Sequence, residues 1–424
     1  MSTPLSYEIH RHRLDNGLRL VVSPDPWTPV VAVNVWYDVG SAHESPGRTG
    51  FAHLFEHLMF AGSAQTGPGE HLGALQSLGG EVNATTSFDR TNYFETVPAG
   101  AAELALWYEA ARLGSLLEAV DQAVLDTERE VVKEEKRQRY DNVPYGDAFT
   151  RLAELVFGPD HPYGHLPIGS MADLDAASLD DVRAFFRRHY LPANAVLSLA
   201  GAISVDEAVR WTEDYFGGLG RGEAPAAPAV PALPPLARPV HAEAFGPVPH
   251  DAVYLAWRVP PFGQADHEAV GLALGVLADG LTARLHADLV RSELADAVSG
   301  SDLDLVRGNS LAVLSATVRD GVDAARVEAA AVATLERFAA EGPTPAELRR
   351  ATARATRDWL AALASLDSRA DALSEAVLVY DDPGRINSWL DEIAGFGVEA
   401  VQAAAAAYLA PSGRTSLVYH KERP

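Results

Sequence analysis

The 424-residue sequence contains no cysteine, which excludes disulfide bonds and thiolate chemistry. Any metal site must therefore use histidine and carboxylate side chains. Lysine is almost as scarce, with residues only at positions 133, 136 and 421, so that arginine carries most of the positive charge. The formal net charge is −24, whereas nucleic-acid-binding surfaces need a basic stripe. We therefore expect no nucleic-acid partner.

Long apolar runs are also missing. No segment approaches eighteen uninterrupted apolar residues, which predicts that the chain does not span a membrane. The first ten residues lack the basic start and apolar run of a secretory signal. With 47% hydrophobic and 22% charged residues, the composition is typical of a globular protein, and we expect a cytoplasmic location.

The order of the expected elements occurs twice. Residues 29–38 and 252–259 are apolar and β-branched, which predicts two buried strands, and each is followed by helices and a pair of strands. Between the two halves, residues 221–239 contain prolines among alanines and predict an extended connector. We therefore expect an α+β fold of two homologous domains, each a mostly antiparallel sheet covered by helices, at 1–220 and 240–424.

Two histidines and a glutamate interrupt an otherwise apolar segment from Gly50 to Phe60. On a helix, His53 and His57 lie one turn apart on one face, with Glu56 beside them. Two imidazoles at this spacing can share a zinc ion (Zn2+), and the carboxylate can take a proton from metal-bound water. As purely structural residues, all three would need partners once desolvated. The pattern therefore predicts metal binding, with a third ligand from elsewhere in the chain.

A helix expected over residues 121–141 is the best source of the third ligand. Glu128 and Glu135 are two turns apart on one face, so that one can bind metal while the other supports it. Glu130 and Glu134 are spaced for a solvated, salt-bridged helix face. Spacing alone does not decide between Glu134 and Glu135 as the ligand.

The segment from Gly50 to Gly62 resembles the inverted zinc motif of the pitrilysin/insulinase metallopeptidases, the inverzincins, which include the mitochondrial processing peptidase. The likeness covers most of the chain and includes the two-half layout. The other similar segments are 81–91, 128–135, 161–164 and Gly169. The resemblance implies that Glu135 is the third zinc ligand.

For the remaining site residues, the resemblance implies that Glu56 is the general base and that Glu128 supports the metal site. It also implies that substrate binds as an extra strand beside Asn83, Ala84 and Thr85, an arrangement that accepts extended polypeptide of varied sequence. Asn83 would hold the substrate backbone, although an asparagine at a strand end also has a purely structural explanation.

Relatives in this family use an arginine and a tyrosine from the second half to polarise the substrate carbonyl. Arg291 matches the arginine, but Val298 stands at the tyrosine position and has no hydrogen to donate. Either Arg291 is a surface residue here, or a partner subunit supplies the donors. In the second half, Asp266, His267 and Glu268 are followed by Gly271, so the metal pattern is absent and His267 is expected to be a surface residue.

The expected function is zinc-dependent endopeptidase activity on short, unfolded or leader-type peptides. The cleavage chamber would be formed by a dimer, either of identical chains or with a related, catalytically silent subunit. The first alternative is a metal-binding but non-catalytic partner subunit of a related peptidase. The second is a metal-dependent hydrolase of another bond, such as an ester.

Overall fold

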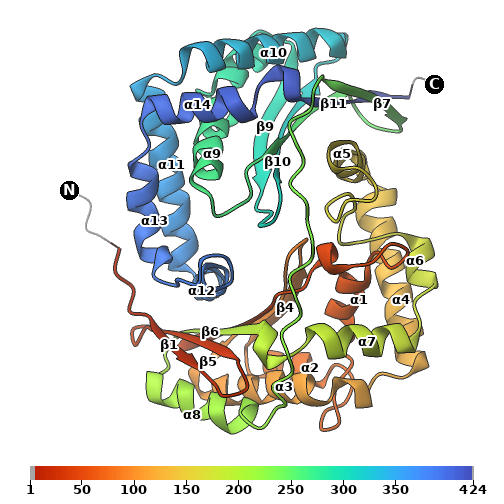
Figure 1. The fold of residues 1–424 in the computed structure, drawn as a ribbon, viewed down its shortest axis with the longest axis vertical. Helices are drawn as coiled ribbons and strands as arrows, with labels where there is room; N and C mark the ends of the chain where they lie inside the picture. Colours follow the sequence, from red (N-terminus) through yellow and green to blue (C-terminus); the bar gives the residue numbers. More distant parts are fainter. Residues whose placement is uncertain (1–4, 423–424) are drawn as a thin grey trace. The chain divides into compact units, whose positions relative to one another are not determined.

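Two mixed β-sheets organise the chain in the computed structural model, which describes residues 5–422 (Figure 1). Unit 1 contains the residues up to Lys136, together with Leu166–Pro228 and Leu360–Trp389. Unit 2 contains Arg137–His165, Ala229–Trp359 and the residues from Leu390 onward. The two sheets, each covered by helices, confirm the expected α+β fold class.

The sheet of unit 1 has the strand order β1-β2-β6-β3-β5-β4, and only the β2–β6 pair is parallel. A turn at Asp15–Gly17 joins the first two strands, and Gly17 has a φ of 98°, in the left-handed region that favours glycine. The strands are β1 (His10–Arg13), β2 (Arg19–Pro24), β3 (Val30–Tyr37), β4 (Glu81–Thr86), β5 (Thr91–Pro98) and β6 (Ala195–Gly201).

Helices cover both faces of this sheet because side chains of successive strand residues point to opposite sides. On one face, α1, α2 and α3 pack against β3, β4 and β5. On the other face, Asp371 of α12 accepts hydrogen bonds from Asn34, Trp36 and Asn92 at 3.1, 2.7 and 2.8 Å. The helices of unit 1 are α1 (Phe51–Leu58), α2 (Glu70–Ser77), α3 (Ala102–Ser115), α4 (Gln122–Lys136), α6 (Met171–Asp175), α7 (Leu179–His189), α8 (Val205–Phe216) and α12 (Leu366–Tyr380).

The sheet of unit 2 has the order β7-β11-β8-β10-β9 and repeats the β2-β6-β3-β5-β4 arrangement, including one parallel pair. Its strands are β7 (Val240–Gly246), β8 (Ala252–Val259), β9 (Ala295–Leu303), β10 (Ser310–Val318) and β11 (Thr415–Lys421). Helices α9 (Ala265–Ala278), α10 (Ala324–Glu341) and α14 (Val398–Tyr408) pack on it, and α11 (Pro345–Ala364) and α13 (Arg385–Ala394) complete the chain.

Each unit takes one helix from the other half of the sequence. Helix α5 (Ala148–Phe157) packs on β8 and β11 of unit 2, and α12 packs on the sheet of unit 1, so the compact units cross the predicted boundaries of 1–220 and 240–424. The prolines of residues 141–169 predict an irregular segment, and this expectation is wrong for α5. Its buried Ala148, Leu152 and Val156 follow helical spacing, and the prolines flank the helix without interrupting it.

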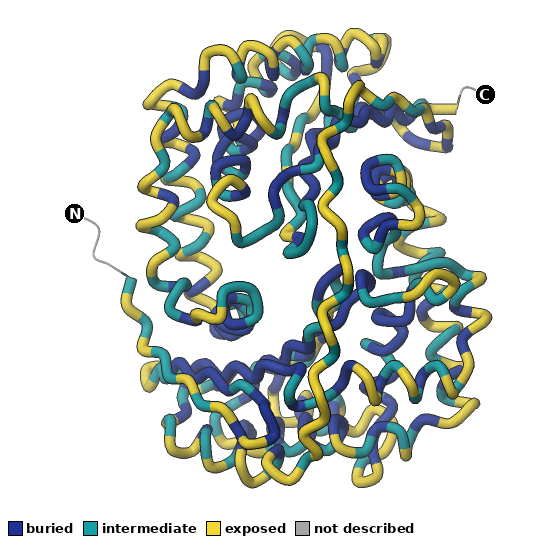
Figure 2. Tube along the Cα trace, viewed as in Figure 1, coloured by how far each residue is buried: buried dark blue, intermediate teal, exposed yellow. Residues whose placement is uncertain are grey.

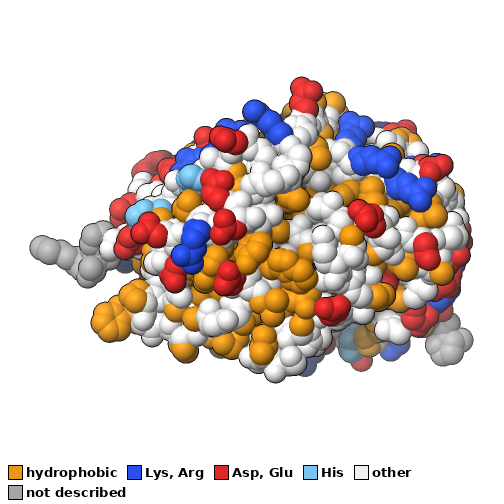
Figure 3. Space-filling view, turned by 90° about the horizontal axis from the view of Figure 1, so that it is seen from below, with side chains coloured by type: hydrophobic (Ala, Val, Ile, Leu, Met, Phe, Trp, Pro, Cys, Tyr) orange, Lys and Arg blue, Asp and Glu red, His pale blue; other side chains and the backbone are white. Residues whose placement is uncertain are grey.

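Burial follows the sheets. The inner strands of the two sheets are mostly buried, whereas β1, β4, β7 and β9 at the sheet edges are mostly not, and the connector at 221–239 is mostly exposed (Figure 2). On the face of unit 1 that carries α3 and α8, hydrophobic side chains lie between scattered charged ones (Figure 3). Within residues 5–422, no single helix is long and apolar enough to cross a membrane, and only α13 and α14 together, across a 95° bend, reach the required length and composition.

Candidate metal centre

Helix α1 is held in place at its N-terminus by a carboxylate from the preceding loop. The backbone N–H groups of Gly50 and Ala52 donate to the two Glu44 carboxylate oxygens at 3.0 and 2.8 Å. A negative charge at this end of a helix satisfies free N–H groups and is favoured by the helix dipole. The apolar side chains Leu54 and Phe55 are fully buried, so the packing of α1 directs its polar residues to one side.

Gly169 contacts the same end of α1. It has a φ of 64°, and a Cβ added there would lie 2.3 Å from the backbone nitrogen of Gly50 and 2.4 Å from its Cα. Only glycine fits this conformation without displacing the start of the zinc-motif helix.

We expect Gly169→Ala to lower the free energy of unfolding by more than about 2 kcal/mol, because backbone strain and the clash with Gly50 add together. Zinc affinity should fall as well, since α1 carries two ligands. The matched control is Gly69→Ala, which has a φ of 69° and no atom within 4 Å of an added Cβ. Denaturant unfolding and zinc titration of both variants check this, and equal losses in the two variants would contradict the proposed role of Gly169.

The structure brings the three predicted metal ligands together. Nε2 of His53 and Nε2 of His57 lie 3.7 and 3.3 Å from the same carboxylate oxygen of Glu135. Ligand atoms around a tetrahedral zinc with bonds of about 2.0–2.2 Å are separated by about 3.3–3.6 Å. Two imidazole nitrogens and one carboxylate oxygen at these distances fit zinc and leave a fourth position for a reactant.

Helix α4 positions the carboxylates of this site. Glu128 and Glu135 share the face of α4 that packs on α1, and Glu128 Oε2 lies 3.6 Å from Nδ1 of His57. A carboxylate at the second imidazole nitrogen orients a metal-bound histidine. Glu134 is exposed and, like Glu130, lies outside this cluster; Glu130 forms an ion pair with Lys133 at 2.9 Å.

Glu56 has a partner that the sequence did not reveal. The hydroxyl of Thr86, at the end of β4, donates to Glu56 Oε2 at 2.6 Å. Burial raises the pKa of Glu56, whereas the Thr86 hydrogen bond and the charge of His57 lower it. The carboxylate is therefore held in a fixed orientation beside the two histidines.

His57 is strongly basic in the metal-free protein. Burial lowers its pKa, but the carboxylates of Glu128 and Glu135 more than offset this effect and raise the pKa to about 9. Zinc binds neutral imidazole, so binding must displace this proton at neutral pH. The apparent zinc affinity should therefore rise about tenfold per pH unit between pH 6 and 8.

Competition titrations against a chromophoric chelator measure this dependence. Glu128→Gln removes one of the two groups that raise the His57 pKa, so the variant should show a shallower dependence. An affinity that is constant between pH 6 and 8 in the wild-type protein would contradict the predicted proton release.

The predicted substrate-binding residues lie on an edge strand. β4 is the last strand of its sheet and pairs only with β5, so its other edge is available for an additional strand. Ala84 is buried, whereas Asn83 and Thr85 are exposed on the opposite side of the strand. The Asn83 side chain accepts from the N–H of Ala84 at 2.9 Å, and Thr85 contacts Asn92.

Arg291 and Val298 belong to unit 2. Residues 284–290 form a short helix that finishes with a π-helical turn at His286–Val290, and Arg291 follows directly after it. The exposed guanidinium of Arg291 donates to the carbonyl of Leu281 at 2.6 Å, and Val298 packs beside the core of unit 2. Within unit 2, the contacts of Arg291 and Val298 do not orient either side chain toward a substrate.

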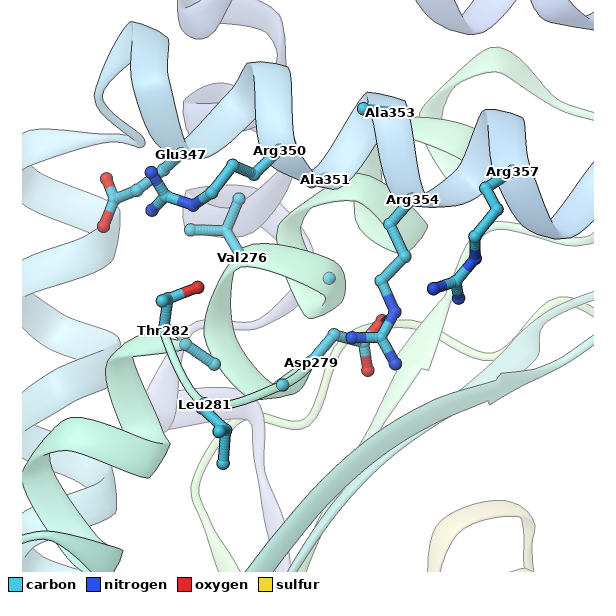
Figure 4. Close-up of a pocket in the computed structure, with 13 residues that line it drawn as sticks. Val276, Asp279, Leu281, Thr282, Glu347, Arg350, Ala351, Ala353, Arg354 and Arg357 are labelled. Atoms are coloured by element: carbon cyan, nitrogen blue, oxygen red, sulfur yellow. Dashed lines mark ion pairs between the residues drawn. The ribbon is translucent and has the colours of Figure 1, made fainter.

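A pocket of about 370 Å³ also lies in unit 2 (Figure 4). Arg350, Arg354 and Arg357 of α11 point into it, and Leu281 lies at its edge. Arg354 is 3.7 Å from Asp279, whose pKa is raised by burial. None of the predicted site residues lines this pocket.

A buried polar cluster behind α1 was also missed by sequence reasoning. Arg112 forms a two-bond ion pair with Glu109, and His71 lies 3.6 Å from Glu95. Burial raises the pKa of both carboxyl groups and lowers that of His71 to about 3. Arg112 also stacks over Tyr93 at 4.3 Å, so the cluster supports the sheet against which α1 packs.

The family model described as "Insulinase (Peptidase family M16)" matches residues 19–149, and that described as "Peptidase M16 inactive domain" matches 176–354. The zinc protease PqqE of Helicobacter pylori is 30% identical over 379 residues, which cover 88% of this chain and 84% of the relative. The chain belongs to peptidase family M16. The predicted resemblance to the pitrilysin/insulinase family is confirmed.

Solved structures place this M16 chain in the two-domain layout. The crystal structure of a protease from Helicobacter pylori has a TM-score of 0.90 at 28% identity and covers 98% of this chain and 99% of that chain. A chain of complex III2 from Candida albicans has a TM-score of 0.83 at 12% identity, with 97% and 96% covered, and shares the fold. The expected similarity to two-domain family members is therefore confirmed.

Proposed function

We propose that this M16 protein is a zinc-dependent endopeptidase that cleaves short, unfolded or leader-type peptides. The observation that carries the proposal is the convergence of His53, His57 and Glu135 at zinc-ligand separations, with Glu56 on the same helix. The name of the Helicobacter pylori relative, a zinc protease, supports it.

The proposed roles follow from the positions of the side chains. Bound zinc would lower the pKa of a water molecule and polarise the scissile carbonyl. Glu56 would take the proton of the attacking water and pass it to the leaving amine. Thr86 holds Glu56 in place, and Glu128 orients His57, so both residues position the groups that react.

Substrate selection would depend on the edge of β4. An extended peptide can pair with the backbone of Asn83, Ala84 and Thr85, whereas a folded protein offers few free strands for such pairing. The proposed substrates are therefore flexible peptides, recognised largely through their backbone.

We further propose that the protein acts as a cytoplasmic dimer whose subunits enclose the substrate. Arg291 is engaged by the backbone of its own unit and Val298 has no hydrogen-bond donor, so donors for the substrate carbonyl would come from another subunit. The partner is then a second copy or a related, catalytically silent chain.

The lack of a hydrogen-bond donor at Val298 also favours a second candidate function. If the carbonyl donors are absent from the complete assembly, the protein would be a metal-binding, non-catalytic partner of a related peptidase. The intact ligand cluster and Glu56 support the catalytic alternative.

Mass in solution and cleavage of a fluorescent flexible peptide should be measured together, for the protein alone and mixed with the product of any adjacent related gene. Activity of a homodimer would show that Val298 is tolerated. Activity only in the mixture would place the donors on the partner. Absence of cleavage in both samples would overturn the peptidase proposal and favour the non-catalytic subunit.

A further inference from the structure

A second convergence of metal-ligand side chains occurs in unit 2. His267 of α9 directs Nε2 toward Asp302 Oδ2 at 3.6 Å and Asp304 Oδ1 at 4.0 Å. One ligand atom from each of the three residues lies within 4.8 Å of the other two. Asp302 is near the end of β9, and Asp304 follows directly after the strand.

His267 is not the surface residue that its sequence context predicts. It is 3% exposed because its ring packs edge-on against Phe262, with ring centres 5.5 Å apart. Its buried Nε2 atom has no hydrogen-bond partner. A buried polar atom without a partner is costly, and this one points at two carboxylates.

The charge of the cluster matches a divalent cation. Neither Asp302 nor Asp304 forms an ion pair with lysine or arginine within residues 5–422. The charged groups that face Asp304 are Asp302, His267 and Glu268. When a neutral His267 is the third ligand, one divalent cation balances the negative charges of Asp302 and Asp304.

The buried cluster of His71, Glu95 and Glu109 in unit 1 differs because it already contains a cation. There, the guanidinium of Arg112 already lies between Glu109 and the aromatic ring of Tyr93. A metal ion would have to share that buried space with a permanent positive charge. The unit 2 cluster has no such competitor.

The ligands are carried by well-defined elements. Gly271 lies one turn after His267 on α9, on the side of the helix that faces Asp302: a Cβ added there would lie 3.7 Å from Asp302 Oδ2, in ordinary van der Waals contact. The segment after β9 is fixed by the hydrogen bond from Phe262 N to Leu305 O at 2.8 Å. Small side-chain rotations would therefore suffice to close the three ligands around one ion.

We propose that His267, Asp302 and Asp304 bind a divalent transition-metal ion that ties the end of β9 to α9. One imidazole and two carboxylates suit Zn2+ and Mn2+, and the exposed Asp304 leaves the ion accessible to exchange. This site is separate from the proposed peptidase centre, and the proposal does not depend on peptidase activity.

The test uses the full chain with the first centre disabled by His57→Ala. Zn2+ and Mn2+ binding is measured by isothermal titration calorimetry in three proteins, all of which carry His57→Ala. The first has no other change, the second also carries Asp302→Asn and Asp304→Asn, and the third also carries Asp296→Asn. Asp296 is an exposed β9 residue outside the cluster and serves as the matched control. Circular dichroism verifies that each variant is folded.

We expect one remaining ion per chain in His57→Ala and in the Asp296→Asn control. Loss of the two carboxylates should weaken binding by at least the roughly 10–100-fold effect of losing an outer-shell metal partner. The single variant Asp304→Asn should also weaken binding, and it changes only an exposed residue. No ion bound by His57→Ala, or binding unaffected by the Asp302 and Asp304 substitutions, would overturn the proposal.

Discussion

Glu56→Gln is expected to lower kcat/KM for a flexible peptide by about 10²–10⁴-fold while the protein keeps its zinc. Glutamine has nearly the same shape as glutamate and can still accept the hydrogen bond from Thr86, but it cannot take a proton from water. The ligands His53, His57 and Glu135 are unchanged. The loss should therefore fall on the chemical step and leave metal binding intact.

Steady-state kinetics with a fluorescent peptide, together with metal analysis of the same samples, measure this effect. Glu130→Gln is the matched control, because Glu130 is an exposed carboxylate of α4 that pairs with Lys133. A Glu56→Gln protein that retains zinc and cleaves at the wild-type rate would show that Glu56 is not the general base.

Glu135→Gln is expected to lower zinc affinity by at least about 10–100-fold, the cost of losing even an outer-shell partner. The carboxylate oxygen of Glu135 is the atom that both histidines approach, and a neutral amide is a much weaker ligand. Peptide cleavage should then disappear at limiting zinc.

Glu134, the neighbour of Glu135 in the sequence, provides the control. Glu134→Gln changes an exposed residue of the same helix and should leave zinc affinity within about twofold, because surface substitutions usually have small effects. Zinc competition titrations compare the two variants. A larger loss in Glu134→Gln than in Glu135→Gln would move the third ligand to Glu134.

The local part of the candidate site could be predicted from the sequence. His53, Glu56 and His57 lie within two turns of one helix, so their relative positions follow from helix geometry. Glu128 and Glu135 likewise share a face of α4. Their approach to α1 could be expected from the family resemblance, since helical spacing does not specify which helices pack together.

Contacts between distant segments were not predictable in this way. Glu44 caps α1 from a loop and Thr86 reaches Glu56 from the end of a strand, and no repeating pattern marks either residue. His267 was predicted to be a surface residue because Gly271 stands where a second metal-binding histidine would be needed. Its burial depends on Phe262 and on carboxylates that lie more than thirty residues later in the chain.

The fold shows the same limit. The apolar, β-branched segments at 29–38 and 252–259 were sufficient to predict β3 and β8, and the repeated order predicted two similar sheets. The exchange of α5 and α12 between the two halves depends on which exposed sheet face each helix covers. The prolines of residues 141–169 also prevented the prediction of α5, because prolines that flank a helix and prolines within an irregular segment give a similar composition.

The most direct test of the zinc-peptidase account is cleavage of one flexible peptide after metal removal and stepwise return of zinc, followed by mass spectrometry. The protein is used in whichever assembly, alone or with a related subunit, the solution mass identifies. The account predicts no cleavage by the chelated protein and recovery as the His53, His57 and Glu135 site fills. Undiminished cleavage by metal-free protein, or an intact peptide after zinc has been restored, would contradict it.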